Sequence, residues 1–374
     1  MQRIGQIIRK EFIQLRRDRR MFFIIFFSPV LQLILLGYAA NLDIKNIPVV
    51  FCDLDASPAS RDFISRFPAS GYFSVGAVIN RLNDIDPYID KGKASLAVIL
   101  PRGMGRKLAG QKPVRIGVVV DGAESQSATI GLNYATMIAA RYAREILIER
   151  LQRFSPGLRI PKVEPEPRIW YNPELRSRNF MIPGVLAMVL MIITMMLTSL
   201  AIVKEKELGT MEQLIVTPIR PAELILGKLL PFFLIGLVDV VIVVLVGTYW
   251  FQVPVKGSIL LLFGLSPSFM LMTLGLGLFI STISGNQQQA MLTAFFFIIP
   301  QIILSGFVFP IENMPRLIQY LTYAVPLRYF MAIIRGLFLK AVGLEALQAP
   351  VVSLLAFGIV ILSLSILRFR KKME

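Results

Sequence analysis

The sequence predicts a membrane all-α fold of six transmembrane helices, with an inserted α/β (α+β) domain on the outer side. Two observations lead to this fold class. The 374-residue chain is 55% hydrophobic with a mean hydropathy of +0.64, above the usage of soluble proteins. Apolar segments long enough to cross a bilayer as helices occur at residues 22–40, 180–203, 224–250, 258–283, 289–309 and 350–368.

The first apolar segment, transmembrane span 1 at residues 21–40, is expected to remain as a signal anchor because no small-residue cleavage site follows it. Residues 1–20 precede it and carry Ile4, Ile7, Ile8, Phe12 and Leu15 at helical spacing, with Arg and Gln between them. This pattern predicts an amphipathic interfacial helix. The sequence leaves open whether that helix is only an anchor or also a lever joining a cytoplasmic partner to the first span.

Basic residues flank both ends of the chain, at Arg16–Arg20 and Arg368–Lys372. Because basic flanks stay cytoplasmic, both termini are expected inside, and six spans satisfy this. The loop 204–222 is then cytoplasmic, and residues 41–178 are outside. We attribute the net charge of +16 to leaflet anchoring and a mildly basic outer domain, and not to nucleic-acid binding.

The outer domain, residues 41–178, shows strands alternating with helices, which indicates an α/β or α+β layer with its own core. A Pro-rich linker at 156–173 leads back to the remaining transmembrane domain, residues 179–374 with spans 2–6. Strands are expected at 47–53, 72–79, 95–100 and 114–120, and helices from Ser57, at 81–91 and at 125–154.

Several kinds of chemistry are excluded by composition. The chain has no histidine and one cysteine, Cys52, so it holds no intrachain disulfide, Cys/His zinc site or Ser-His-Asp triad. It has no P-loop and cannot bind ATP in that manner; Gly227–Lys228 lacks the rest of the motif. Asp53, Asp55 and Asp121 are interpreted as turn and cap residues more readily than as catalytic ones. No catalytic residue, metal or cofactor is predicted on this chain.

A charged segment, Lys204–Leu214, lies between the second and third spans. It cannot enter the membrane core, so it must lie on one face, available to a partner. Few polar residues lie inside the predicted transmembrane spans. Asp239 in span three is a functional candidate by default, although bonding to a neighbouring helix or a wet cavity is the more economical interpretation. Gln32 and Gln301 are candidate partners for it.

Three motifs in order carry a family resemblance. The run 204–218 (KEKELGTMEQLIVTP) and the run 304–315 (LSGFVFPIENMP), followed by Pro326–Phe330 and Ile334–Gly336, resemble type-2 ATP-binding-cassette (ABC) exporter permeases. The opening of the outer domain at Val50–Ser57 is similar to the bacterial multidrug-type subfamily, which has a large extracytoplasmic domain between spans one and two. The resemblance covers essentially the whole chain.

The resemblance implies a site for an ATPase. Such permeases pair as homodimers or paralogous heterodimers above cytoplasmic ABC ATPase subunits, which bind ATP and Mg. Segment 204–216 would be the coupling helix. Glu205, Glu207 and Glu212 would offer carboxylates to the ATPase, Gly209 would permit close approach, and Thr210 would cap the next turn.

The resemblance also implies an outer gate. Segment 305–326 is too rich in proline and polar residues for a simple crossing, so it is expected to be re-entrant and shielded by protein or water. Its gate residues are expected to be Gly306, Pro310, Glu312, Pro315 and Pro326.

We therefore expect a multi-pass permease subunit of the bacterial inner (cytoplasmic) membrane, with no enzymatic activity of its own. It would use a separate ATPase to move an amphiphilic substrate, a drug or lipid-like molecule, out of the cytoplasm or inner leaflet, in contact with membrane lipids. The alternative is a membrane-anchored scaffold whose outer domain docks a periplasmic adaptor protein. ATPase activity that is unaffected by this subunit would favour the scaffold.

Overall fold

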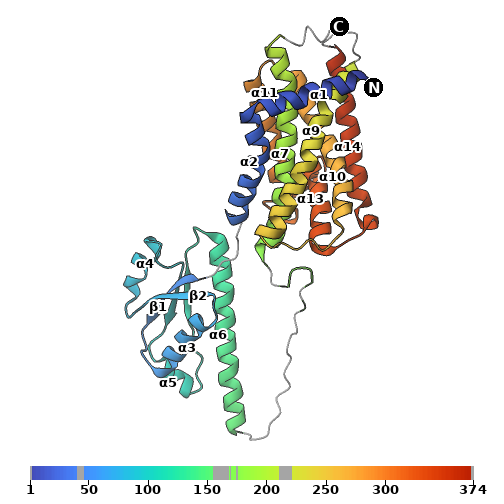
Figure 1. Cartoon of the computed structure of the whole chain (residues 1–374). Coiled ribbons are helices and arrows are strands. Elements are labelled where there is room, and N and C mark those ends of the chain that lie inside the picture. The colour runs from blue at the N-terminus through green and yellow to red at the C-terminus, as the bar shows by residue number, and fades with distance from the viewer. Residues whose placement is uncertain are drawn as a thin grey trace. The chain divides into compact units, whose positions relative to one another are not determined.

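A computed structural model describes residues 2–39, 46–154, 168, 170–173, 176–209 and 221–371. The chain divides into two compact units, one of Met1–Asn41 with Arg168–Glu374 and one of Leu42–Pro167. The first unit is helical, and the second contains a small mixed sheet (Figure 1). The Pro-rich linker predicted at 156–173 lies almost wholly outside the described residues.

The helical unit contains long helices joined by short turns. Its helices are α1 (Gln2–Arg17), α2 (Arg19–Ala39), α7 (Ser177–Glu207), α9 (Pro221–Leu245), α10 (Ile259–Ile283), α11 (Gln287–Leu304), α12 (Arg316–Thr322), α13 (Pro326–Arg335) and α14 (Leu344–Lys371). Shorter turns are η2 (Val246–Trp250), η3 (Ile311–Asn313) and η4 (Gly336–Lys340).

Five helices of the described residues are long and apolar enough to cross a membrane, or six if a bent pair is counted as one span. The five are α7, α9 continued by η2, α10, α11 and α14. Helices cover most of each of the six predicted spans. α11 ends at Leu304, before the end predicted at residue 309, and α2 runs from Arg19 to Ala39 with Ile25–Ala39 as a shorter apolar segment.

The bent pair is Arg316–Thr322 and Pro326–Lys340, whose axes differ by 81°. Such a pair is either a broken span or a re-entrant loop. It extends to Lys340, beyond the end predicted at residue 326. Pro326 does not close the segment, because it occupies the first turn of α13, where proline needs no amide hydrogen.

Helix α7 forms the centre of the helical unit. Of its most apolar window, 83% is buried, against 17% for α14, so α7 packs within the unit while α14 leaves most of its apolar surface exposed. Gly277 of α10 allows the close contact with α7, since a Cβ there would lie 2.7 Å from the Met195 carbonyl oxygen. Gly275 faces α14, where Ser365 Oγ donates to the Gly275 carbonyl at 3.1 Å.

The second unit has a four-stranded sheet in the order β2-β1-β3-β4. β1 pairs in parallel with β2 and β3, and β3 pairs antiparallel with β4. The elements are β1 (Ile47–Asp53), α3 (Pro58–Ala69), β2 (Phe73–Ile79), η1 (Leu82–Asp84), α4 (Asp86–Asp90), β3 (Leu96–Leu100), α5 (Met104–Ala109), β4 (Gly117–Val120) and α6 (Ser125–Phe154).

Each face of this sheet buries its own apolar cluster. Phe51 and Val49 pack with Phe63 and Phe67 of α3 and with Tyr142 of α6. On the other face, Cys52 and Val50 pack with Ile85 and Ala97. The alternation of side chains along a strand places Phe51 and Cys52 on opposite faces. A sheet covered on both sides has the core that an independently folding unit requires.

We expect residues 43–175, expressed alone, to be soluble and to unfold cooperatively. The Asp53 carboxylate, 8% exposed, accepts hydrogen bonds from the Asp55 and Ala56 amides at 3.0 and 2.9 Å and from Ser60 Oγ at 2.7 Å. Asp53→Ala removes these acceptors and should cost about 1–3 kcal/mol in the free energy of unfolding, measured by denaturant titration. Exposed Asp90→Ala is the control. A fragment that aggregates or melts without cooperativity would refute independent folding.

Candidate functional site

The charged segment begins as the last turn of α7, which runs without a break to Glu207. The Leu208 amide donates to the Lys204 carbonyl at 3.0 Å, and the Gly209 amide to the Lys206 carbonyl at 3.2 Å. Gly209 has φ +70°, a left-handed conformation that ends the helix and favours glycine. A Cβ added to Gly209 would meet no atom of the described residues within 4 Å, and the left-handed backbone conformation is what favours glycine here. Thr210 and Glu212 lie outside the described residues.

Glu205, one of the carboxylates predicted to contact the ATPase, faces the interior of the helical unit. The side chain is 7% exposed, and its Oε2 lies 2.6 Å from Lys228 Nζ of α9. Its Oε1 pairs with Lys10 Nζ of α1. This carboxylate is therefore buried and paired within the chain, and Glu207 is the exposed carboxylate among the described residues of the charged segment.

Lys228 is the centre of this cluster and is 2% exposed. Its Nζ lies 3.4 Å from Glu11 Oε1 of α1, in addition to its pairing with Glu205. Sequence reasoning considered Lys228 only as part of an incomplete P-loop. The feature of the sequence that indicates this cluster is a lysine within an apolar helix, because a buried lysine requires an acidic side chain near it.

The amphipathic helix α1 packs on α9, and its buried stripe differs slightly from expectation. Of the predicted apolar stripe, Ile7 and Leu15 are buried in the helical unit and Phe12 is 40% exposed. Glu11, which lies between Ile7 and Leu15 in the sequence, is also buried. Near the end of α1, Asp18 pairs with Lys204 Nζ at 3.5 Å. A cavity of about 390 Å³ lies beside these charges, with Gln14 and Phe232 in its wall.

The exposed part of the α7 end is tied to the turn between α10 and α11. Lys206 Nζ donates to the Ser284 carbonyl at 3.1 Å, and Gln287 Nε2 donates to Glu207 Oε2 at 2.6 Å. Lys206, Glu207 and Gly209 are exposed, and Leu208 is 66% exposed. These contacts place the end of α7 and the turn between α10 and α11 at one end of the bundle, together with α1 (Figure 1).

The predicted gate residues lie around the bent pair. Gly306 has φ +81°, and its carbonyl accepts from Arg335 Nη1 at 3.0 Å. The Arg335 guanidinium also lies 3.7 Å from the centre of the Phe180 ring. Pro310 and Pro315 precede η3 and α12, Pro326 opens α13, and Glu312 is exposed. Arg335 is the residue in this region whose individual role the sequence did not indicate.

Asp239 lies in the middle of α9 and is 1% exposed. Neither carboxylate oxygen has a hydrogen-bond partner among the described residues. The predicted pairing with Gln32 or Gln301 is therefore not found. Gln32 Nε2 donates to Ser28 Oγ on its own helix at 3.1 Å, and Gln301 is 7% exposed with Oε1 unpartnered in the described chain.

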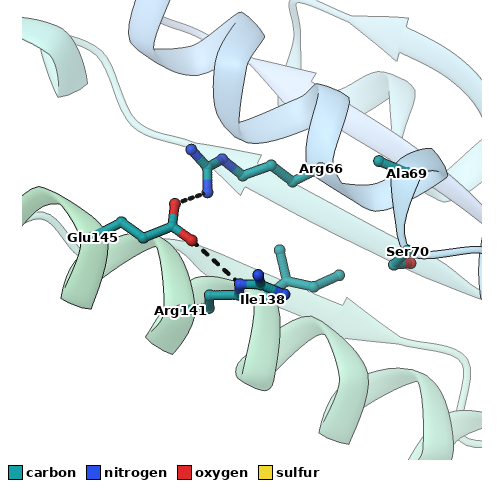
Figure 2. Close-up of a pocket in the computed structure, with 6 residues that line it drawn as sticks. All are labelled: Arg66, Ala69, Ser70, Ile138, Arg141 and Glu145. Atoms are coloured by element: carbon teal, nitrogen blue, oxygen red, sulfur yellow. Dashed lines mark hydrogen bonds and ion pairs between the residues drawn. The ribbon is translucent and has the colours of Figure 1, made fainter. Parts of the chain in front are cut away.

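The sheet-containing unit has a shallow pocket of about 280 Å³ between α3 and α6. Glu145 lies between Arg66 and Arg141 and pairs with both, as Figure 2 shows. The Arg66 hydrogen bond and charge hold the pKa of Glu145 below its usual range. Asp53, Asp55 and Asp121 accept hydrogen bonds at strand ends and at the start of α5, in agreement with the turn and cap interpretation.

The arrangement defines a class of protein: a membrane-embedded helical bundle with one charged, exposed end and a covered sheet in a separate unit. Residues 19–367 match the model of the ABC-2 family transporter proteins, and the chain belongs to this family. Membership indicates a transmembrane subunit of an ABC transporter rather than an enzyme, and it implies an ABC ATPase partner and a dimer of membrane subunits.

Proteins of Escherichia coli K12 are similar over the full length. The probable multidrug ABC transporter permease YbhR is 32% identical, covering 99% of each chain. The probable multidrug ABC transporter permease YbhS is 32% identical, covering 100% of this chain and 98% of its own. The inner membrane transport permease YhhJ is 27% identical, covering 97% and 95%.

Proposed function

We propose that this chain is the permease subunit of an ATP-driven exporter that moves an amphiphilic substrate out of the cytoplasm or inner leaflet. The observation that carries this is the end of α7, a helix that is mostly buried along its span and ends in an exposed, charged turn. Exposed charge at the end of a central helix can transmit force from a cytoplasmic ATPase into the bundle. The names of two E. coli relatives, which are probable multidrug ABC transporter permeases, support a drug as the substrate.

The contact with the ATPase is assigned to Glu207, Leu208 and Gly209, continuing into 210–216. Glu207 offers a carboxylate to basic groups of the partner, and the exposed Leu208 offers apolar contact. ATP binding and hydrolysis on the partner would then shift the bundle between inward- and outward-facing populations. The segment around Gly306 and the bent pair forms the proposed outer gate.

We further propose that both termini and residues 204–222 are cytoplasmic in a bacterial inner membrane, with 41–178 outside. The ion pairs of α1 with the α7 end support a shared side for these two elements. In a Cys52→Ala background, an impermeant maleimide should label Asp90→Cys in intact spheroplasts and Glu207→Cys only after permeabilisation. The reverse order of labelling would contradict this orientation.

Reconstitution in proteoliposomes tests the function. The chain and its ATPase should together give ATP-dependent movement of a fluorescent amphiphile, and the chain should stimulate ATP hydrolysis. An ATPase inactivated in its P-loop is the control. ATP hydrolysis that is indifferent to the presence of this chain would favour the scaffold alternative.

A further inference from the structure

Four charged side chains from three helices meet in the helical unit. Lys228 comes from the second turn of α9, Glu205 from the end of α7, and Lys10 and Glu11 from α1. We name these four residues the charge cluster. It contains two cations and two carboxylates, so it is balanced, and three of its members are no more than 7% exposed.

We propose that Lys228 is a positioning residue that holds α1, the end of α7 and the start of α9 together as one body. Its single ammonium contacts one carboxylate from α7 at 2.6 Å and one from α1 at 3.4 Å. Burying these ions carries a large desolvation cost, so they add little net stability. The best-attested use of such a group is to fix the register of the elements that it joins.

The packing around the charge cluster supports the same conclusion. A Cβ added to Gly227 would lie 2.8 Å from Ile7 Cγ2, so α1 lies directly against α9 beside Lys228. Ile7 is 8% exposed in this contact. An amphipathic helix held only by lipid has no need of charges on its buried stripe, whereas Glu11 is 6% exposed on that stripe and contacts Lys228.

The consequence for coupling rests on the proposed function. Glu205 precedes Gly209 by four positions, and Lys228 follows Pro221 by seven, so the cluster joins both flanks of the segment proposed to contact the ATPase. A displacement of that segment then reaches α1 directly and, through α1, the start of α2. This makes α1 a moving part of the transmission and not only an anchor.

The test measures whether α1 stays seated when the ammonium is removed. In a Cys52→Ala background that keeps Lys228, the cysteine of Ile7→Cys should react slowly with maleimide. The cysteine of Ile13→Cys, at an exposed position, should react quickly. Lys228→Met leaves the cluster with an excess buried negative charge, which destabilises the seating of α1. We expect the labelling rate at position 7 to rise at least about tenfold and the rate at position 13 to stay unchanged. An unchanged rate at position 7 overturns the proposal.

A charge-balanced variant separates bridging from simple charge compensation. Lys228→Met with Glu11→Gln leaves the neutral Lys10–Glu205 pair but no link between α9 and α1, so position 7 should still label quickly. Slow labelling in this variant would show that charge balance alone keeps α1 seated and would overturn the proposal. We expect transport per ATP hydrolysed to remain reduced by at least about tenfold in this variant. Full transport by it would show that the bridge is dispensable and would overturn the proposal.

Two further features of the experiment keep its result interpretable. If Lys228→Met does not reach the membrane, Glu11→Leu carries the labelling test, because leucine removes the acceptor on α1 and leaves Glu205 paired with Lys228. Labelling of position 7 needs the permease alone. Failure of the wild-type chain to bind any ATPase would therefore defeat the proposed function while leaving the labelling result standing.

Discussion

Gly209→Val is expected to abolish ATP-driven transport while the protein still inserts in the membrane. The left-handed φ of +70° at Gly209 costs a non-glycine residue about 1–2 kcal/mol, and a β-branched residue more. Valine would therefore redirect the chain as it leaves α7 and displace the whole segment that follows. The measurements are transport, ATPase stimulation and the melting temperature of the purified permease.

Gly209→Asn is the matched control, because asparagine adopts the left-handed conformation at small cost. It should keep most of the transport activity.

A second variant, which reverses a charge, tests the neighbouring contact. Glu207→Lys should reduce the stimulation of the ATPase without changing the melting temperature of the permease, since Glu207 is exposed. Normal export by both Gly209→Val and Glu207→Lys would show that this turn does not transmit force.

Asp239→Leu is expected to stop transport and to leave the permease as stable as before, or more stable. The carboxylate is 1% exposed and lacks a hydrogen-bond partner among the described residues, so it imposes a desolvation cost that leucine removes. That cost is about 1–3 kcal/mol. A costly intramembrane carboxylate without a structural partner is best explained by a role in another conformation or with water.

The comparison of Asp239→Asn with Asp239→Leu identifies this role. Activity kept by the asparagine variant and lost by the leucine variant would indicate hydrogen bonding in a conformation populated during transport. Loss in both would indicate that the ionisable group itself is needed. Normal transport by the leucine variant, together with raised thermal stability, would contradict a functional role for Asp239.

The positions of most helices and strands could be predicted from the local sequence. The bounds expected for the long helix at 125–154 agree with α6, and the apolar spans are helical because length and hydropathy determine them. Helix α5 was not predicted, because six residues between Gly103 and Gly110 are too short to show periodicity. The strand expected at 114–120 begins only at Gly117, since Pro113 and its neighbours do not pair with β3.

Side-chain roles at the site could not be predicted in the same way. Glu205 and Glu207 are two positions apart, so they point in nearly opposite directions on a helix that turns by about 100° per residue. Which of them is buried depends on where α1 and α9 pack, and that is tertiary information. The sequence therefore predicted a charged segment, but of its two described glutamates Glu205 is buried and Glu207 is exposed.

Site-specific photo-cross-linking tests most directly whether the α7 end contacts an ATPase. A photoreactive amino acid would replace Glu207, with a second version of the protein carrying it at Tyr320, which is 72% exposed in α12. We predict that position 207 captures a P-loop ATPase, identified by mass spectrometry, and that ATP with vanadate changes the yield. Capture of no ATPase at 207, or equal capture at 320, would contradict the account.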